Sequence, residues 1–138
     1  MPKKRSNCPL SFSLDIFGDK WSLLIIRDII MMGKFSFIDF SKSAEKIASN
    51  ILASRLELLE KEGIIYKQVS PKNKSKYIYS LTKKGIDLQP VLIEMMKWGA
   101  KYNSETPVPP KKIIEEYEED NKSLLRKYRT KQKDILNQ

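Results

Sequence analysis

Residues 47–63 read IASNILASRLELLEKEG, and their pattern decides the fold of the chain. At 100° per residue the apolar residues fall on one broad arc and the small or polar residues on the other. The apolar arc holds Ala48, Ile51, Leu52, Leu56, Leu58 and Leu59, and the opposite arc holds Ser49, Asn50, Ala53, Ser54, Glu57 and Lys61. Ala48 or Ser49 stands at the expected N-cap, and Gly63 stands where a left-handed residue ends a helix. The pattern predicts a helix with one face on a core and one face without bulky apolar groups.

Two short segments rich in β-branched and aromatic residues follow this helix. They span residues 64–69 and 77–81, and the residues between them, 70–76, are turn-forming. Six lysines and no acidic residue occur from Lys67 to Lys84. A helix with a small polar face beside a basic hairpin describes a winged helix-turn-helix, whose helix enters the DNA major groove while the wing lies along phosphates. Taken alone, the helix also fits an ordinary amphipathic surface helix.

Length and charge agree with a small DNA-binding domain. The chain has 138 residues, of which 41% are hydrophobic, enough for one domain with a core. Its 26 basic and 17 acidic residues give a net charge of +9, which favours a polyanionic partner.

Several functional classes lack the residues they need. The chain has one cysteine and no histidine, which excludes an internal disulfide and leaves a Cys/His zinc site without ligands. A Cys-His or Ser-His pair cannot form, and no Gly-rich phosphate loop occurs, so we expect no enzyme, metal or cofactor. The apolar runs are short and charge-interrupted and no cleavage site follows the basic start, so we expect a cytoplasmic protein without a membrane span.

The rest of the chain reads mainly as helices. We expect a basic mobile N-terminus over residues 1–7, helices over 10–17 and 20–32, and a short helical piece over 35–43 with Phe35, Ile38 and either Phe37 or Phe40 inward. Thr82 is expected to cap a long helical pattern that reaches Tyr102, with a kink or restart at Pro90. Its apolar surface is broader than one small domain needs, which favours cover by a second subunit.

Residues 106–138 are expected to form a Pro-rich linker and a helical tail after a domain spanning residues 8–105. The linker, residues 106–110, contains three prolines and is expected to be a stiff polyproline segment. Residues at alternating spacings of three and four then form a heptad seam, namely Ile114, Tyr117, Asn121, Leu124, Tyr128, Lys131 and Ile135. The seam leaves two alternatives open, a paired coiled coil and a solvated or frayed helix.

A set of short strings, in order and spacing, resembles the HxlR-type transcriptional regulators, a winged helix-turn-helix family of bacteria and archaea. The strings lie within residues 8–103 and comprise Cys8-Pro9, Gly18-Asp19-Lys20-Trp21, Leu24-Ile25-Ile26-Arg27-Asp28, Gly33 with Phe35, residues 47–52, Arg55-Leu56 with Leu59-Glu60, Glu62-Gly63-Ile64, Tyr79-Ser80-Leu81-Thr82 with Gly85, and residues 88–92 with Trp98-Gly99. The resemblance implies a winged helix-turn-helix with N- and C-terminal dimerisation helices, and residues 106–138 lie outside it. With the tail read from its own spacing, the expected fold is mainly α with a small β-hairpin and a helical C-terminal tail.

The resemblance implies a homodimer that places two recognition helices in successive major grooves of a pseudo-palindromic operator in double-stranded DNA and regulates, most often represses, a nearby gene. Carried over by position, the groove-facing residues are Ser49, Asn50, Ala53 and Ser54, and Lys76 is the best-matched wing contact. With the other lysines of the turn, the wing set is Lys72, Lys74 and Lys76. Asn50 can pair with an adenine edge, and serines can contact bases or phosphates. Arg55 falls within the apolar arc and is interpreted as a structural ion-pair residue.

Three further hypotheses accompany this interpretation. Cys8 is a candidate redox or electrophile sensor, since several members of the family sense through an N-terminal cysteine and a basic run precedes it; the alternative is a packing thiol. The tryptophans and paired methionines fit core packing, and a small-molecule effector pocket is the alternative. The basic wing could instead bind an acidic protein partner.

Overall fold

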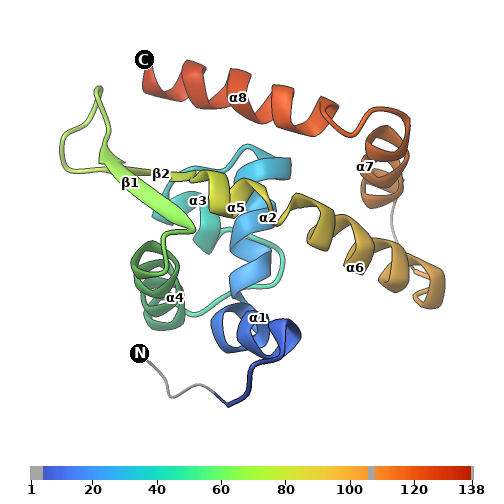
Figure 1. The fold of residues 1–138 in the computed structure, drawn as a ribbon. Helices are drawn as coiled ribbons and strands as arrows, with labels where there is room; N and C mark the ends of the chain where they lie inside the picture. The colour runs from blue at the N-terminus through green and yellow to red at the C-terminus, as the bar shows by residue number, and fades with distance from the viewer. Residues whose placement is uncertain (1–4, 106–107, 138) are drawn as a thin grey trace.

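The computed structural model describes residues 5–105 and 108–137, without the side chains of residues 108–110. In this part of the chain helices surround one antiparallel hairpin, which confirms the predicted mainly helical fold (Figure 1). The elements are α1 Pro9–Phe17, α2 Ser22–Met32, α3 Phe37–Ser41, α4 Ser49–Lys61, β1 Ile65–Val69, β2 Tyr77–Leu81, α5 Lys83–Ile86, α6 Gln89–Tyr102, α7 Val108–Glu119 and α8 Ser123–Leu136. No helix among these residues is both long enough and apolar enough to cross a bilayer.

Helix α2 runs through the centre of the molecule. Ile26 and Ile29 are fully buried, as the nearly continuous apolar sequence predicts. The helix starts at Ser22, two residues later than predicted, because the Asp19 carboxylate accepts hydrogen bonds at 3.0 Å from the backbone amides of Trp21 and Ser22. Gly33 ends it with a φ of 65°, a left-handed conformation that glycine adopts without strain.

Helices α3 and α4 form the predicted helix-turn-helix. Ser36 and Asp39 cap α3 reciprocally, which fixes its start two residues after Phe35. Three residues predicted to face inward are exposed instead: Ala48, Ile38 by 59% and Ile51 by 38%. Phe40 lies 200° around α3 from Ile38 and takes the inward position, while Ile51 stands at the rim of an arc centred on Leu52.

The hairpin has two different faces because side chains alternate along each strand. Tyr66 pairs with Ser80 and Gln68 with Ile78, and these residues point to the side that α8 covers. The alternate pairs, Lys67 with Tyr79 and Val69 with Tyr77, point to the opposite face, where Lys67 reaches Glu60 of α4.

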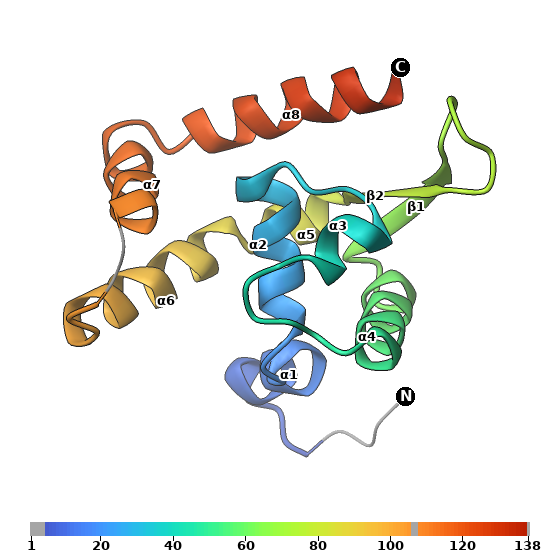
Figure 2. The ribbon, with the colours of Figure 1, turned by 180° about the vertical axis from the view of Figure 1, so that it is seen from behind.

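Helix α6 restarts the chain after α5 and projects from the body (Figure 2). Thr82 caps α5 as predicted, by accepting a hydrogen bond from the Gly85 amide. Pro90 stands in the first turn of α6, where its missing N–H costs nothing, so it begins a helix and does not kink one. Helix α7 packs against α6 where Lys97 lies 3.6 Å from Glu118, on the side of α6 that carries the buried Ile93.

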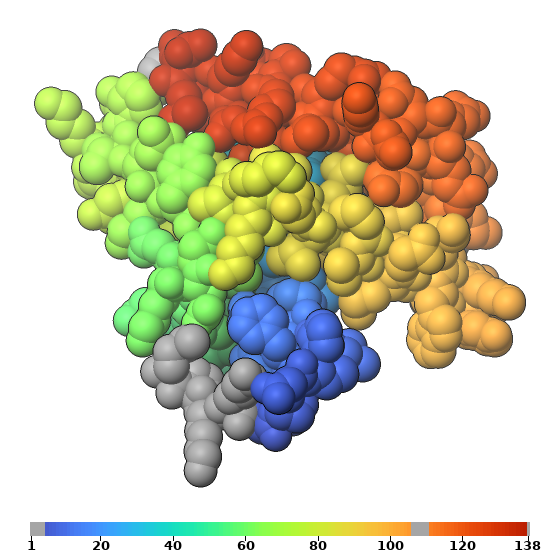
Figure 3. Space-filling view, in the orientation of Figure 1, coloured from blue at the N-terminus to red at the C-terminus, as the bar shows by residue number. Residues whose placement is uncertain are grey.

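The C-terminal segment departs from both alternatives for residues 106–138. Residues 106 and 107 lie outside the described residues, and residues 108–110 begin α7, so the expected polyproline segment is helical there. The heptad seam is broken between α7 and α8, and α8 folds back onto the core (Figure 3). Tyr128 is 1% exposed, and its ring centroid lies 6.1 Å from that of Phe35. Of the residues that form the predicted coiled-coil seam, Leu124 and Tyr128 of α8 are buried in the core, whereas Lys131 is exposed and Ile114 and Tyr117 lie on α7.

Candidate nucleic-acid interface

Helix α4 is held at the edge of the molecule by an ionic clamp from α2. The two terminal guanidinium nitrogens of Arg27 donate to the carboxylate of Glu45, at 2.8 and 2.9 Å, in the turn between α3 and α4. The next residue of α2, Asp28, accepts a hydrogen bond from Ser43 in the same turn. The hydrogen bonds from Arg27 hold the pKa of the Glu45 carboxyl at about 2. This clamp fixes the turn and therefore the direction in which α4 leaves it.

The outward face of α4 carries the predicted groove-facing residues. Leu52, Leu56 and Leu59 are buried in the core. The four residues predicted to face the groove, Ser49, Asn50, Ala53 and Ser54, are all exposed. They occupy the first two turns, where short side chains let a surface approach the backbone closely. Two hydroxyls and one carboxamide supply both donors and acceptors, the groups that discriminate base edges in a major groove.

Arg55 does not belong to this outward set. Its guanidinium lies 3.7 Å from the Asp19 carboxylate at the start of α2 and its side chain is 28% exposed. This ion pair supports the interpretation of Arg55 as a structural residue, and the same guanidinium donates to the Ser54 hydroxyl oxygen at 3.4 Å. Burial raises the pKa of Asp19, but hydrogen bonds from Ser22 and from backbone amides outweigh it, so the carboxyl pKa is lowered and Asp19 is a stable partner for Arg55.

The wing loop is ordered by its own side chains. The carboxamide oxygen of Asn73 accepts hydrogen bonds from the Ser75 amide at 3.1 Å and from the Ser75 hydroxyl at 2.7 Å. The Ser70 amide donates to the Lys76 carbonyl at 2.7 Å, which closes the loop. Lys72, Lys74 and Lys76 are all exposed on it, so the loop holds three ammonium groups at the tip of the hairpin.

The other three lysines of the basic run have internal partners. Lys67 lies 4.0 Å from a Glu60 carboxylate oxygen and its ammonium is 4.6 Å from the centroid of the Tyr77 ring. Lys83 pairs with Asp87, and Lys84 donates to the Glu62 carbonyl at 2.7 Å. The sequence gives no reason to distinguish the six lysines. In the structure the three on the wing loop, Lys72, Lys74 and Lys76, are the ones available to an external partner.

A hollow of about 380 Å³ lies between α4 and the strands of the hairpin. Glu57, one turn beyond Ala53, borders it together with Lys67 and Tyr79. The helical period places Glu57 on the polar arc of α4. It does not show that Glu57 faces the hairpin, because that depends on how α4 and the hairpin pack. A second hollow, of about 350 Å³, lies between α3 and the wing loop and is bordered by Lys76.

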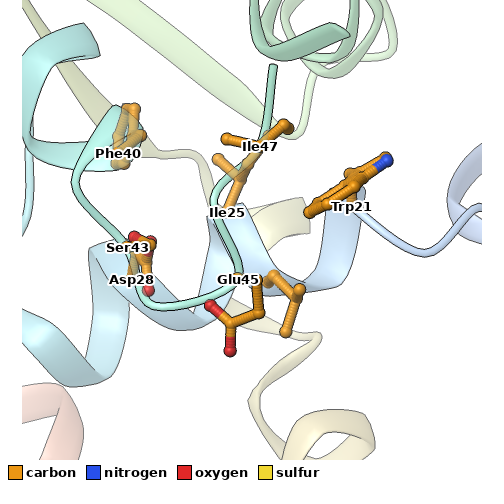
Figure 4. A pocket seen from close by; sticks show the side chains of 8 residues that line it. Trp21, Ile25, Asp28, Phe40, Ser43, Glu45 and Ile47 are labelled. Atoms are coloured by element: carbon orange, nitrogen blue, oxygen red, sulfur yellow. The ribbon is translucent and has the colours of Figure 1, made fainter. Parts of the chain in front are cut away.

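The hollow beside Trp21 is too small for an effector molecule. Its volume is about 10 Å³, which is space for about one water molecule (Figure 4). Trp21, Ile25 and Phe40 line it with the residues of the α3–α4 turn, so it is a packing defect behind the clamp. The expectation of core packing is wrong for three other residues, because Trp98 is 70% and Met95 57% exposed on α6, and Met32 is 47% exposed at the end of α2.

Cys8 stands at the start of α1 with an exposed thiol. Hydrogen bonds from the backbone amides of Ser11 and Leu10 lower the pKa of this thiol, whereas the sequence had pointed to the preceding basic run. Arg5 of that run is paired with Asp15 at 2.7 Å; residues 1–4 lie outside the described residues. Across the described chain no three acidic or cysteine residues converge to hold a metal ion.

Comparison with known proteins places these features among transcription regulators. Residues 16–107 match the model of the HxlR-like helix-turn-helix. The uncharacterized HTH-type transcriptional regulator YdeP of Bacillus subtilis is 39% identical over 69% of this chain and 73% of its own length. The HTH-type transcriptional regulator YodB of B. subtilis is 35% identical over 69% of this chain and 85% of its own.

Solved structures support the same relationship. The redox regulator HypR in its oxidized form superposes with a TM-score of 0.61 and 32% identity, covering 73% of this chain and all of that one. The reduced form of YodB superposes with a TM-score of 0.56 and 32% identity, covering 74% of this chain and all of that one. These neighbours share the fold of about three quarters of this chain.

Proposed function

Because this chain belongs to the HxlR-like helix-turn-helix family of transcriptional regulators, we propose that it binds specific sequences of double-stranded DNA as a homodimer and represses a nearby gene. The observation that carries the proposal is the pairing of two surfaces on one edge: the small polar face of α4 and the three free lysines of the wing loop. The α4 face reads base edges in the major groove, and the wing lysines bind backbone phosphates.

Within this proposal Asn50 supplies most of the base discrimination. The NH₂ group of a carboxamide can donate to adenine N7 while its oxygen accepts from the adenine N6 amino group. No other base presents this pair of an acceptor and a donor side by side in the major groove. Ser49 and Ser54 contact base edges or phosphates, and Ala53 leaves room for the groove floor. Each wing lysine neutralises a phosphate without regard to sequence.

Exposed apolar side chains on α6 and α1 support the homodimer. Helix α6 exposes residues spaced four, three and four apart, namely Val91, Met95, Trp98 and Tyr102, by 37 to 70%. Helix α1 exposes Leu10, Phe12 and Leu14 by 49 to 66%. A monomer rarely leaves so many large apolar side chains exposed to water, whereas a symmetric pair buries them.

Repression is the expected mode of action. A dimer whose α4 helices occupy two major grooves one helical turn apart covers the DNA between them and blocks other proteins from it. The protein acts where the chromosome lies, which in bacteria and archaea is the cytoplasm.

The proposal is tested by fluorescence anisotropy of the full chain on its own upstream intergenic DNA and on a scrambled duplex, across a salt series. Wild type should prefer the upstream duplex. Asn50→Ala should erase that preference, while Lys76→Ala should weaken binding to both duplexes and reduce the log-log salt slope by about 0.9 for each chain that loses a phosphate contact.

Lys84→Ala is the matched control for Lys76→Ala. It removes the same charge from the same basic run, but Lys84 already donates to the Glu62 carbonyl, so the salt slope should not change. If wild type binds both duplexes equally and Asn50→Ala changes neither affinity, the proposal that α4 recognises a specific DNA sequence is contradicted. A wild type that binds neither duplex would instead favour the alternative, a basic wing for an acidic protein.

We further propose that Cys8 gives this regulator a response to electrophiles or oxidants. The thiol is exposed and its pKa is lowered by amides at the start of α1, so a reactive thiolate forms more readily. The neighbours include the redox regulator HypR and a quinone-bound form of YodB. With one cysteine in the chain, the product is an adduct, a mixed disulfide or a bridge between subunits.

The response is expected to act through the subunit interface. Cys8 adjoins Leu10, the first of the exposed apolar residues of α1, so a bulky adduct there disturbs that face. Treatment with a quinone should change the affinity of wild type for the upstream duplex and leave Cys8→Ser unchanged. The sensor role is refuted if both proteins respond equally.

A further inference from the structure

Helix α8 lies along the side of the hairpin and ends beside the wing loop. The Leu81 amide donates to the Tyr128 hydroxyl oxygen at 2.9 Å, at the base of the hairpin. One turn on, the Gln132 side-chain amide donates to the Tyr66 hydroxyl oxygen at 3.1 Å. Three residues further, Ile135 borders a hollow that the wing loop also lines. The C-terminal half of α8 is thus fixed against the element that we propose to contact phosphates.

The cations of α8 are distributed unequally between its two ends. Arg126 and Lys127, in its first half, pair with Asp120 and Glu116 of the preceding segment. The next three cations of α8 form no ion pair with any described residue, and we call Arg129, Lys131 and Lys133 the basic end of α8. All three are exposed, and from Arg129 to Leu136 the single acid, Asp134, leaves a net charge of 3 − 1 = +2. The Lys131 side chain lies against Gly33 at the end of α2, and the Arg129 guanidinium lies 5.7 Å from the centroid of the Tyr128 ring, so Lys133 and Arg129 are the cations of this group left for an external partner. The free charge of α8 therefore gathers at the end near the wing.

Figures 1 and 2 show from opposite sides that α4, the hairpin loop and the C-terminal end of α8 lie along one edge of the molecule. DNA placed against α4 and the wing continues past the wing toward this end of α8. A duplex carries a phosphate charge about every 1.7 Å along its axis, so an exposed cation on that edge meets the backbone without any requirement for sequence.

The hollow between the wing loop and α8 has the character of a phosphate-backbone site. Its volume is about 490 Å³, and Lys72 and Lys76 line it together with the hydroxyl-bearing Ser70 and with Asn73. Ile78 and Ile135 form its apolar part. Ammonium, hydroxyl and carboxamide groups are those that contact phosphates and sugars in protein–DNA complexes.

We propose that the basic end of α8 extends the DNA-binding edge beyond the wing and contacts phosphates of duplex DNA that flanks the sequence read by α4. This contact rests on the proposed function of the wing and α4, and it lies outside residues 16–107, which match the family model. It adds affinity and salt dependence without adding sequence preference, and it requires a longer duplex than the wing and α4 need.

The test compares the full chain with Arg129→Gln/Lys133→Gln on two duplexes: the upstream DNA trimmed to the shortest high-affinity fragment, and the same fragment with about one helical turn added at each end. A matched control, Lys111→Gln/Lys112→Gln, removes two exposed charges from α7, which lies away from the wing in both views. Thermal melts show that each variant is folded, and Lys133→Gln alone replaces the double variant if that one melts early.

On the longer duplex the log-log salt slope of the α8 variant should be shallower by about 0.9 for each phosphate contact that is lost. If each chain loses two contacts, the affinity deficit of the variant relative to wild type should shrink about tenfold per bound chain between 50 and 200 mM salt. On the trimmed duplex it should match wild type, and the α7 control should match wild type on both. An unchanged slope on the longer duplex, or an equal loss in the α7 control, overturns this contact while leaving the proposed function intact. A wild type that shows no preference for the upstream sequence refutes the proposed function itself.

Discussion

Removing one hydroxyl from Tyr128 tests whether α8 belongs to the folded core. Tyr128→Phe keeps the ring on Phe35 but leaves the Leu81 amide, in a residue that is 2% exposed, without the partner it has at 2.9 Å. An unsatisfied buried donor costs about 1–3 kcal/mol. For 138 residues the unfolding entropy near the midpoint is about 0.29 kcal/mol/K, so the melting temperature should fall by about 3–10 °C.

The assay is a thermal melt followed by circular dichroism at one fixed protein concentration, because association shifts the midpoint. Tyr117→Phe is the matched control: Tyr117 is half-buried on α7, and its hydroxyl makes no hydrogen bond to a described residue, so its midpoint should stay within about 1–2 °C of wild type. Equal midpoints for Tyr128→Phe and wild type would refute the docking of α8 on the hairpin.

Three further perturbations address the core, the clamp and the subunit interface. Leu52→Ala removes a fully buried side chain of α4 and should lower the free energy of unfolding by about 2–5 kcal/mol in chemical denaturation. Arg27 holds the pKa of Glu45 at about 2 against an ordinary value of 4.5, so the clamp stabilises the fold above pH 4.5 and this contribution is lost as pH falls toward 2. Glu45→Gln should therefore be less stable than wild type at neutral pH and show a flatter acid limb in pH-dependent melts; parallel limbs would exclude the clamp as the cause. Trp98→Glu, at a position 70% exposed in one chain, should convert dimer to monomer in sedimentation without lowering the helical circular dichroism signal, and an unchanged dimer would place the interface elsewhere.

The helix-turn-helix and the wing could be predicted because their signals are local. Capping residues, Gly33 and Gly63 mark helix ends by backbone chemistry that needs no tertiary contact. The hairpin follows from a turn-forming segment between two β-prone strands. The exposure of Asn50 follows from the helical period, since Leu52, Leu56 and Leu59 fix which face is buried.

The place of α8 could not be predicted because its pattern has two solutions. Leu124, Tyr128 and Ile135 recur at the spacing that suits both a coiled-coil partner and the chain's own core. The choice depends on Phe35 and Leu81, which are more than 40 residues away and provide the ring contact and the amide donor. Non-local contacts of this kind leave no trace in local periodicity.

The sequence also did not reveal which lysines of the basic run have partners within the protein. In the sequence, Lys67 and Lys84 cannot be distinguished from Lys74 and Lys76. Lys67 reaches Glu60, and Lys84 reaches the Glu62 carbonyl, only after α4 and the hairpin have packed together. Free charge at an interface is therefore a property of the fold, whereas total charge is a property of the composition.

The most direct test of sequence reading by α4 is selection of binding sites from a pool of random duplexes by the full chain and by Asn50→Ala. We predict that wild type enriches an inverted repeat whose half-site centres are about 10 base pairs apart, with an adenine specified in each half-site, and that Asn50→Ala loses that base while keeping the spacing. Enrichment of no motif by wild type, or of the same motif by both proteins, would contradict the assignment of α4 as the reading helix.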